Sequence, residues 1–75
     1  MNDEMILIAI AALDIEREDA ISNCKELPEI NAFYFWSKSR GGKAVIIDEN
    51  GEKLVATSIV SLEQHIQAFR NGRRN

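Results

Sequence analysis

The chain of 75 residues contains one cysteine, one proline and one histidine, and this scarcity excludes several classes of structure. Cys24 has no second cysteine with which to form a disulfide within the chain. One cysteine and one histidine do not make a structural zinc site without several carboxylates. A domain this short buries only about 60% of the surface of its unfolded chain, so its stability is marginal. We therefore expect one domain over residues 1–75, with a frayed tail at 72–75, that gains stability by associating with itself or with a partner.

Long apolar runs and a basic amino-terminal segment are also missing. The apolar stretch Met5–Leu13 is too short to span a bilayer. Asp3 and Glu4 precede it, where a signal peptide carries basic residues. A lone cysteine without an export signal is typical of the reducing cytoplasm. The sequence therefore predicts a cytoplasmic protein that makes no contact with a membrane.

The net charge of −3 is unevenly distributed along the chain. Residues 1–29 carry eight acidic and two basic side chains, which gives −6, whereas residues 30–75 carry four acidic and seven basic side chains, which gives +3. Such asymmetry indicates attraction between oppositely charged parts of one fold or of two copies, or else an interaction surface.

Alternating spacings of four and three predict one helix over residues 3–27. They join Ile6, Ile10, Leu13, Arg17, Ala20, Cys24 and Leu27, all apolar except Arg17. Pro28 ends this helix, because the residue before a proline resists the helical conformation. The alternative is a buried strand over Met5–Ala12 followed by a helix from Asp14. Alanines at positions 9, 11 and 12 favour the helix.

A second apolar stripe lies beside the first on this predicted helix. A helix that is apolar on most sides is buried on more than one side, and one small sheet covers only one of them. We therefore expect the second stripe to form part of a protein interface. Its members are Met5, Ile8, Ala12 and Ile15.

The second half of the chain predicts three strands and a short helix. The strands cover 32–36, 43–48 and 53–59, and Asn50-Gly51 predicts a two-residue type I′ turn that places Asp48 opposite Lys53. Ser61–Gln64 has the pattern of a capping box at the start of a helix. The expected fold is α+β in the order α-β-β-β-α, with a three-stranded antiparallel meander packed against a long N-terminal helix and a short C-terminal helix.

The strand at 32–36 is aromatic, and strand alternation splits its rings between two faces. Phe33 and Phe35 point to one side, and Tyr34 and Trp36 to the other. One pair belongs to the core. The other pair forms an apolar interface or, together with Lys38, Arg40 and Lys43, a platform on which single-stranded nucleic acid stacks.

No constellation of residues indicates catalysis. Cys24 and His65 are the one nucleophile and base that this sequence suggests, but their spacing does not support such a pair. A cysteine on an apolar stripe behaves as a small hydrophobe, and His65 is expected on a helix surface. We expect no catalytic residue, no metal ligand and no cofactor.

These observations predict a non-enzymatic protein-interaction module, of adaptor, inhibitor or immunity type. It forms a homodimer or docks on a larger protein partner through an interface made of Met5, Ile8, Ala12, Ile15, Tyr34 and Trp36. The alternative is a nucleic-acid-binding module that uses the aromatic strand with Lys38, Arg40 and Lys43. A third hypothesis is an enzyme subunit whose site is completed by another chain.

Overall fold

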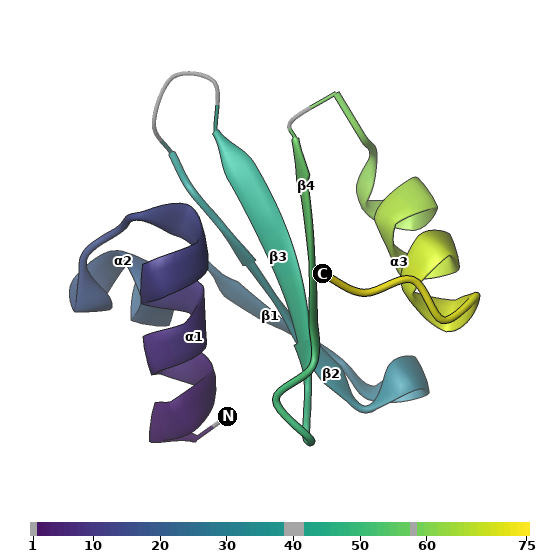
Figure 1. Ribbon diagram of the computed structural model, residues 1–75. Coiled ribbons are helices and arrows are strands. Elements are labelled where there is room, and N and C mark those ends of the chain that lie inside the picture. Colours follow the sequence, from purple (N-terminus) through teal and green to yellow (C-terminus); the bar gives the residue numbers. More distant parts are fainter. Residues whose placement is uncertain (1, 39–41, 58) are drawn as a thin grey trace.

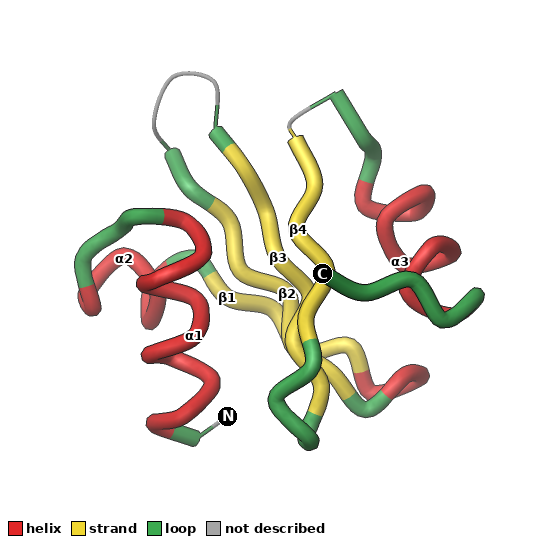
Figure 2. The backbone as a smooth tube through the Cα atoms, viewed as in Figure 1, coloured by secondary structure: helices red, strands yellow, loops and turns green. Residues whose placement is uncertain are grey.

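The computed structural model describes residues 2–38, 42–57 and 59–75. The elements, in chain order, are the helix α1 (Asp3–Leu13), the short helix α2 (Arg17–Ser22), the strand β1 (Cys24–Leu27), the 3-10 helix η1 (Pro28–Ile30), the strands β2 (Ala32–Trp36), β3 (Lys43–Asp48) and β4 (Lys53–Thr57), and the helix α3 (Leu62–Arg70). The four strands form one antiparallel sheet in the order β1-β2-β3-β4 (Figure 1). Helices α1 and α2 lie on one side of the sheet and α3 lies on the other (Figure 2).

The predicted α+β class, with an antiparallel meander between an N-terminal and a C-terminal helix, is confirmed. The meander has four strands rather than three, because β1 adds a strand that the sequence prediction assigned to the first helix. The sheet is therefore the middle layer of three.

Local capping determines where α1 begins and ends. Asn2 Oδ1 accepts a hydrogen bond from the backbone N of Met5 at 2.9 Å. At the other end Asp14 adopts a left-handed conformation with φ of 54°, and its N–H donates to the carbonyl of Ile10 at 2.9 Å. Aspartate is one of the few residues with a side chain that visit this region. The helical interpretation of residues 5–12 is therefore correct, and the helix stops at Leu13.

The single helix predicted over residues 3–27 is wrong beyond Leu13, because the chain next forms α2 and then β1. The apolar residues of the predicted stripe still pack within the fold, but they lie on both sides of the sheet. Cys24 packs on the α1 side of the sheet, whereas Leu27 is buried on the α3 side. Pairing of β1 with the aromatic strand β2 thus overrides a helical spacing that is only a local signal.

The turn between β3 and β4 is not the predicted type I′ turn. Asp48 N–H donates to the carbonyl of Glu52, and Gly51 N–H donates to the carbonyl of Asp48, both at 3.0 Å, so the loop has three residues. Gly51, with φ of 83°, is the residue of this loop in the left-handed region. That pattern is typical of a type I turn followed by a left-handed glycine.

The longer loop shifts the strand register by one residue. Lys53 lies opposite Ile47 rather than opposite Asp48. As a result Val55 shares the α1 side with Val45 and Ile47, and Leu54 shares the α3 side with Ile46, whereas the predicted register places Leu54 opposite Ile47.

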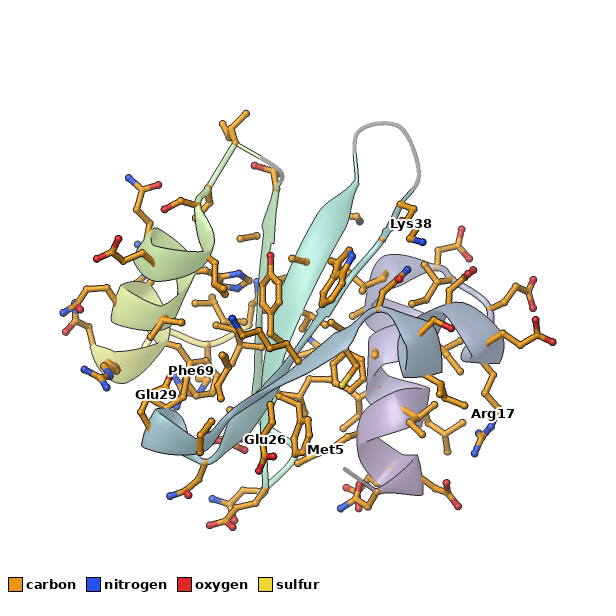
Figure 3. All side chains as sticks on the ribbon, turned by 180° about the vertical axis from the view of Figure 1, so that it is seen from behind. Met5, Arg17, Glu26, Glu29, Lys38 and Phe69 are labelled. Carbon is orange, nitrogen blue, oxygen red and sulfur yellow. The ribbon has the colours of Figure 1, made fainter. Side chains whose placement is uncertain are left out.

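Both faces of the sheet carry a hydrophobic core. The α1-side core consists of Met5, Ile6, Ala9, Leu13, Ala20, Phe35, Val45 and Ile47. The α3-side core consists of Leu27, Ala32, Ile46 and Phe69. In Figure 3, which shows the molecule from behind, Met5 of α1 lies between that helix and the sheet, and Phe69 lies between α3 and the sheet. The sheet is therefore packed on both faces.

Helix α3 begins at the capping box that the sequence predicts. Ser61 Oγ accepts from the backbone N of Gln64, and Gln64 Oε1 accepts from the backbone N of Ser61, both at 3.1 Å. These two bonds satisfy N–H groups that have no partner within the helix. Among the described residues, no helix combines the length and the apolar character needed to cross a bilayer.

The C-terminal residues are held against β4, in place of the frayed tail that the sequence predicts. Asn75 N–H donates to the carbonyl of Lys53 at 2.9 Å, and Asn75 Oδ1 accepts from the backbone N of Val55 at 3.0 Å. Arg74 Nη1 donates to the carbonyl of Phe69 at 2.8 Å, and its guanidinium lies 3.5 Å from the centre of that ring. Asn75 thus covers part of the outer edge of β4, where a further strand would otherwise pair.

Candidate functional site

The aromatic strand β2 divides its rings between the two faces of the sheet, as predicted. Phe35 is completely buried in the α1-side core, and Phe33 packs against the same core. Tyr34 and Trp36 point to the α3 side, where both are half-buried. Their ring centres lie 5.7 Å apart with an angle of 31° between the planes. The pair on the α1 side is therefore the core pair, and the Tyr34–Trp36 pair is the one available at the surface.

These two rings line a pocket of about 650 Å³ on the α3 face of the sheet, which we call the aromatic groove. Helix α3 packs over β3 and β4, away from β1 (Figure 1). The groove lies where this helix leaves the sheet uncovered, and its apolar part is completed by Ala44, Val60 and Leu62. A surface hollow with an aromatic floor and aliphatic walls suits an inserted apolar side chain.

The charged side chains that line the groove are both lysines. They are Lys25 from β1 and Lys43 from the start of β3, and both are exposed. No carboxylate is among the described residues that line it. Lys38, also exposed, follows β2 two residues after Trp36, and Arg40 lies outside the described residues. The groove is therefore basic in a chain whose net charge is negative.

His65 is buried against Tyr34 of the groove, rather than lying on the helix surface as predicted. Its side chain is 1% exposed, and its ring meets the ring of Tyr34 edge-on, with 5.8 Å between centres. His65 Nε2 lies 2.7 Å from the carbonyl oxygen of Leu54. A carbonyl only accepts, so Nε2 carries the proton in this bond. The histidine thus ties α3 to β4 and holds Tyr34 in place.

Burial lowers the pKa of His65 below its ordinary value of 6.5, and the hydrogen bond to Leu54 opposes this shift only in part. The folded chain therefore binds fewer protons than the unfolded chain just below that value. Stability is expected to be complete above about pH 6.5 and to fall as the pH drops through the window between 6.5 and the lower folded pKa. Urea unfolding from about pH 8 to about pH 5, followed by fluorescence, measures this loss.

The matched control for this pH dependence is His65→Gln, whose amide donates a hydrogen bond but does not titrate. Its stability is expected to change much less between about pH 7 and about pH 5 than that of the parent chain. If the stability of both proteins fell equally with decreasing pH, the loss would come from carboxylates instead.

The structure does not bring the six predicted interface residues into one surface. Met5 is buried in the α1-side core, and its neighbours Ile8, Ala12 and Ile15 are half-buried against that core. Tyr34 and Trp36 lie on the opposite face of the sheet. Contacts within the chain thus cover part of this stripe, because α1 packs directly on the sheet.

Cys24 and His65 are also separated by the sheet. Cys24 packs against the α1-side core, whereas His65 contacts Tyr34 on the α3 side. Burial raises the pKa of the Cys24 thiol, which disfavours the reactive thiolate. Among the residues that the structure describes, no group of three or more histidines, cysteines and carboxylates is placed to hold a metal ion.

Of the described residues that line the groove, Tyr34, Trp36 and Lys43 were predicted as site residues and the other seven were not. Lys25 was assigned to a helix, Val60 lies between the last strand and the last helix, and Leu62 is the first residue of α3. A signal for Lys25 was its position two residues before Leu27 and just ahead of Pro28, because residues two apart share one face of a strand. Comparison of the chain with protein-family models, with curated proteins and with solved structures finds no match.

Proposed function

We propose that this chain is a non-enzymatic protein-interaction module that associates with itself through the aromatic groove. The observation that carries the proposal is the Tyr34–Trp36 pair, half-buried in a hollow of about 650 Å³. Tyrosine and tryptophan dominate the energetic centres of protein interfaces, since they bury a large apolar area with little loss of conformational entropy. Docking on a larger partner as an adaptor, inhibitor or immunity-type protein would use the same groove. A cytoplasmic location belongs to the same proposal and is supported by the lone cysteine.

The other large apolar side chains at the surface do not compete with this groove. Among the described residues they are Leu7, Ile21 and Ile59, which belong to α1, α2 and the segment after β4. Single exposed apolar residues are normal on a soluble surface. The groove, in contrast, places two aromatic and several aliphatic residues together.

Light scattering across the micromolar range is expected to show a mass that rises from 8.5 kDa to at least twice that value. Trp36→Ala is expected to weaken association by about tenfold or more, because a central aromatic anchor contributes more than 1 kcal/mol. Circular dichroism checks that the variant is folded. A parent chain that stays at the monomer mass throughout this range would contradict the proposal.

Leu7→Ala is the matched control, since Leu7 is exposed on α1 and lies outside the groove. It is expected to leave association unchanged. An equal weakening in both variants would show that association depends on exposed apolar surface in general.

Single-stranded nucleic acid is the second candidate ligand, because an aromatic pair flanked by lysines without a carboxylate also suits stacked bases and phosphates. We expect this binding to be weak and strongly salt-dependent, since few cations face the groove. Arg74 does not line the groove, and its guanidinium contacts Phe69 and lies 3.8 Å from Asp48 Oδ2. Sub-micromolar binding of a labelled single-stranded oligonucleotide at physiological salt would favour this candidate over self-association.

A further inference from the structure

Self-association through the aromatic groove does not have to be symmetric, and the charges around the groove argue against a symmetric dimer. A two-fold axis through the groove would bring Lys25 and Lys43 of each copy together with the same lysines of the other. The described lining holds no carboxylate to compensate them. Like charges that face each other across an interface destabilise it.

The edge of β1 is a poor symmetric contact for a similar reason. Residues opposite each other in an antiparallel sheet share a face, so a symmetric pair of β1 strands is centred on one residue. If the strand pair is centred on Lys25, the Lys25 side chains of the two copies lie opposite each other. If it is centred on Glu26, the two Glu26 side chains lie opposite each other. Both arrangements oppose like charges directly.

A complementary surface for the groove lies on the same chain, at α2. The segment 14–22 carries four carboxylates against the single cation Arg17, and all five side chains are exposed. Arg17 is committed to Asp3, with 3.0 Å between Nη2 and Oδ1, and Figure 3 shows it directed away from the sheet. Within this acidic surface Ile21 is 52% exposed, one helical turn after Glu18.

The acidic surface and the basic groove face away from each other. Helix α2 lies on the α1 side of the sheet, and the groove lies on the α3 side (Figure 1). One molecule thus presents an aliphatic side chain among carboxylates on one side, and aromatic rings among lysines on the other. Surfaces arranged in this way join two copies without pairing like charges.

We propose that copies of this chain associate head to tail, with α2 of one copy seated in the aromatic groove of the next. Ile21 enters the hollow beside Tyr34 and Trp36, and Glu18, which shares its helix face, lies toward Lys25 and Lys43 of the second copy. This inference rests on the proposed function and specifies its geometry. A heterologous contact of this kind leaves one groove and one α2 free in every dimer, so association continues beyond two copies unless a ring closes.

The test uses two variants that each remove one half of the contact. Lys43→Glu reverses a charge of the groove, and Ile21→Lys places a cation at the centre of the acidic surface. Both positions are exposed, so both chains are expected to fold, which circular dichroism checks. Each variant alone is expected to associate about tenfold or more weakly than the parent chain, as measured by light scattering.

An equal mixture of the two variants is the decisive measurement. The Ile21→Lys chain keeps an intact groove and the Lys43→Glu chain keeps an intact α2, so one good contact forms between them. The mixture is expected to reach at least about twice the monomer mass of 8.5 kDa, whereas each variant alone stays lighter.

Three results would overturn the head-to-tail arrangement. A mixture no heavier than either variant alone would exclude it. An Ile21→Lys chain that associates as the parent chain does would exclude it as well and would leave the proposed function standing with a symmetric groove contact. A parent chain that remains monomeric would overturn both the arrangement and the proposed function.

Discussion

Replacing Leu13 by aspartate is expected to unfold the domain. Leu13 closes the last turn of α1 and is 5% exposed within the α1-side core. A charge buried there without a partner costs several kcal/mol. The total stability of a chain of this length is about 4–11 kcal/mol, so such a loss removes much or all of it. Urea unfolding followed by circular dichroism and by the fluorescence of the single tryptophan measures the change.

Leu7→Asp is the matched control, because it makes the same substitution on the same helix. Leu7 is 59% exposed, and surface substitutions usually change stability by no more than about 0.5 kcal/mol. A comparable loss in both variants would contradict the orientation of α1 on the sheet.

The same series tests the predicted interface stripe of α1. Ile8 and Ile15 are half-buried against the α1-side core, so Ile8→Asp and Ile15→Asp are expected to lower stability to an extent between those of Leu13→Asp and Leu7→Asp. If either variant kept full stability and lost association, the stripe would be an interface after all.

Replacing Gly51 by valine is expected to lower stability by about 1–3 kcal/mol, the range for a residue held in a sparsely populated backbone conformation. Gly51 has φ of 83°, which a β-branched residue strongly resists. An added Cβ would lie 3.3 Å from Glu4 Oε1 and 3.6 Å from Ile8 Cδ1. The carboxylate is the mobile end of a side chain, so backbone strain is the larger contribution.

Asn50→Val distinguishes the observed turn from the predicted one. A type I′ turn requires positive φ at both central residues, so both substitutions would be costly. In the structure Asn50 does not have positive φ, and it is exposed. Its replacement is therefore expected to change stability by no more than about 0.5 kcal/mol. Equal losses at the two positions in urea unfolding would favour the type I′ turn.

The parts of the fold that local chemistry determines could be predicted from the sequence. The capping box at Ser61 places the start of α3, and the runs at 32–36 and 43–48 match β2 and β3 in type and extent. These segments carry their signal in neighbouring residues: side chains that satisfy the backbone, or β-branched and aromatic runs.

The segment after α1 could not be predicted, because its structure depends on distant partners. Cys24–Leu27 contains no β-branched or aromatic residue, and it becomes a strand by pairing with β2. The left-handed residue Asp14 interrupts the helix at a position where apolar spacing continues. The spacing of apolar residues indicates which residues are buried, but it does not distinguish a helix from a turn followed by a strand.

The candidate site shows the same division. Alternation along β2 predicted that Tyr34 and Trp36 share a face, and they do. The groove around them combines residues from four strands and from the segment leading into α3, so its lysines and aliphatic walls appear only in three dimensions. His65 was misplaced because a lone histidine among polar helix residues gives no sign that a strand carbonyl faces it.

Association through the aromatic groove would cover Trp36, which is the single tryptophan of the chain. The most direct measurement is quenching of Trp36 fluorescence by acrylamide at increasing protein concentration, with the mass recorded on the same samples by light scattering. Trp36 is expected to become protected from the quencher, with emission shifted to shorter wavelength, over the same concentrations at which the mass rises. A mass that rises while quenching and emission stay constant would show that the contact lies outside the groove.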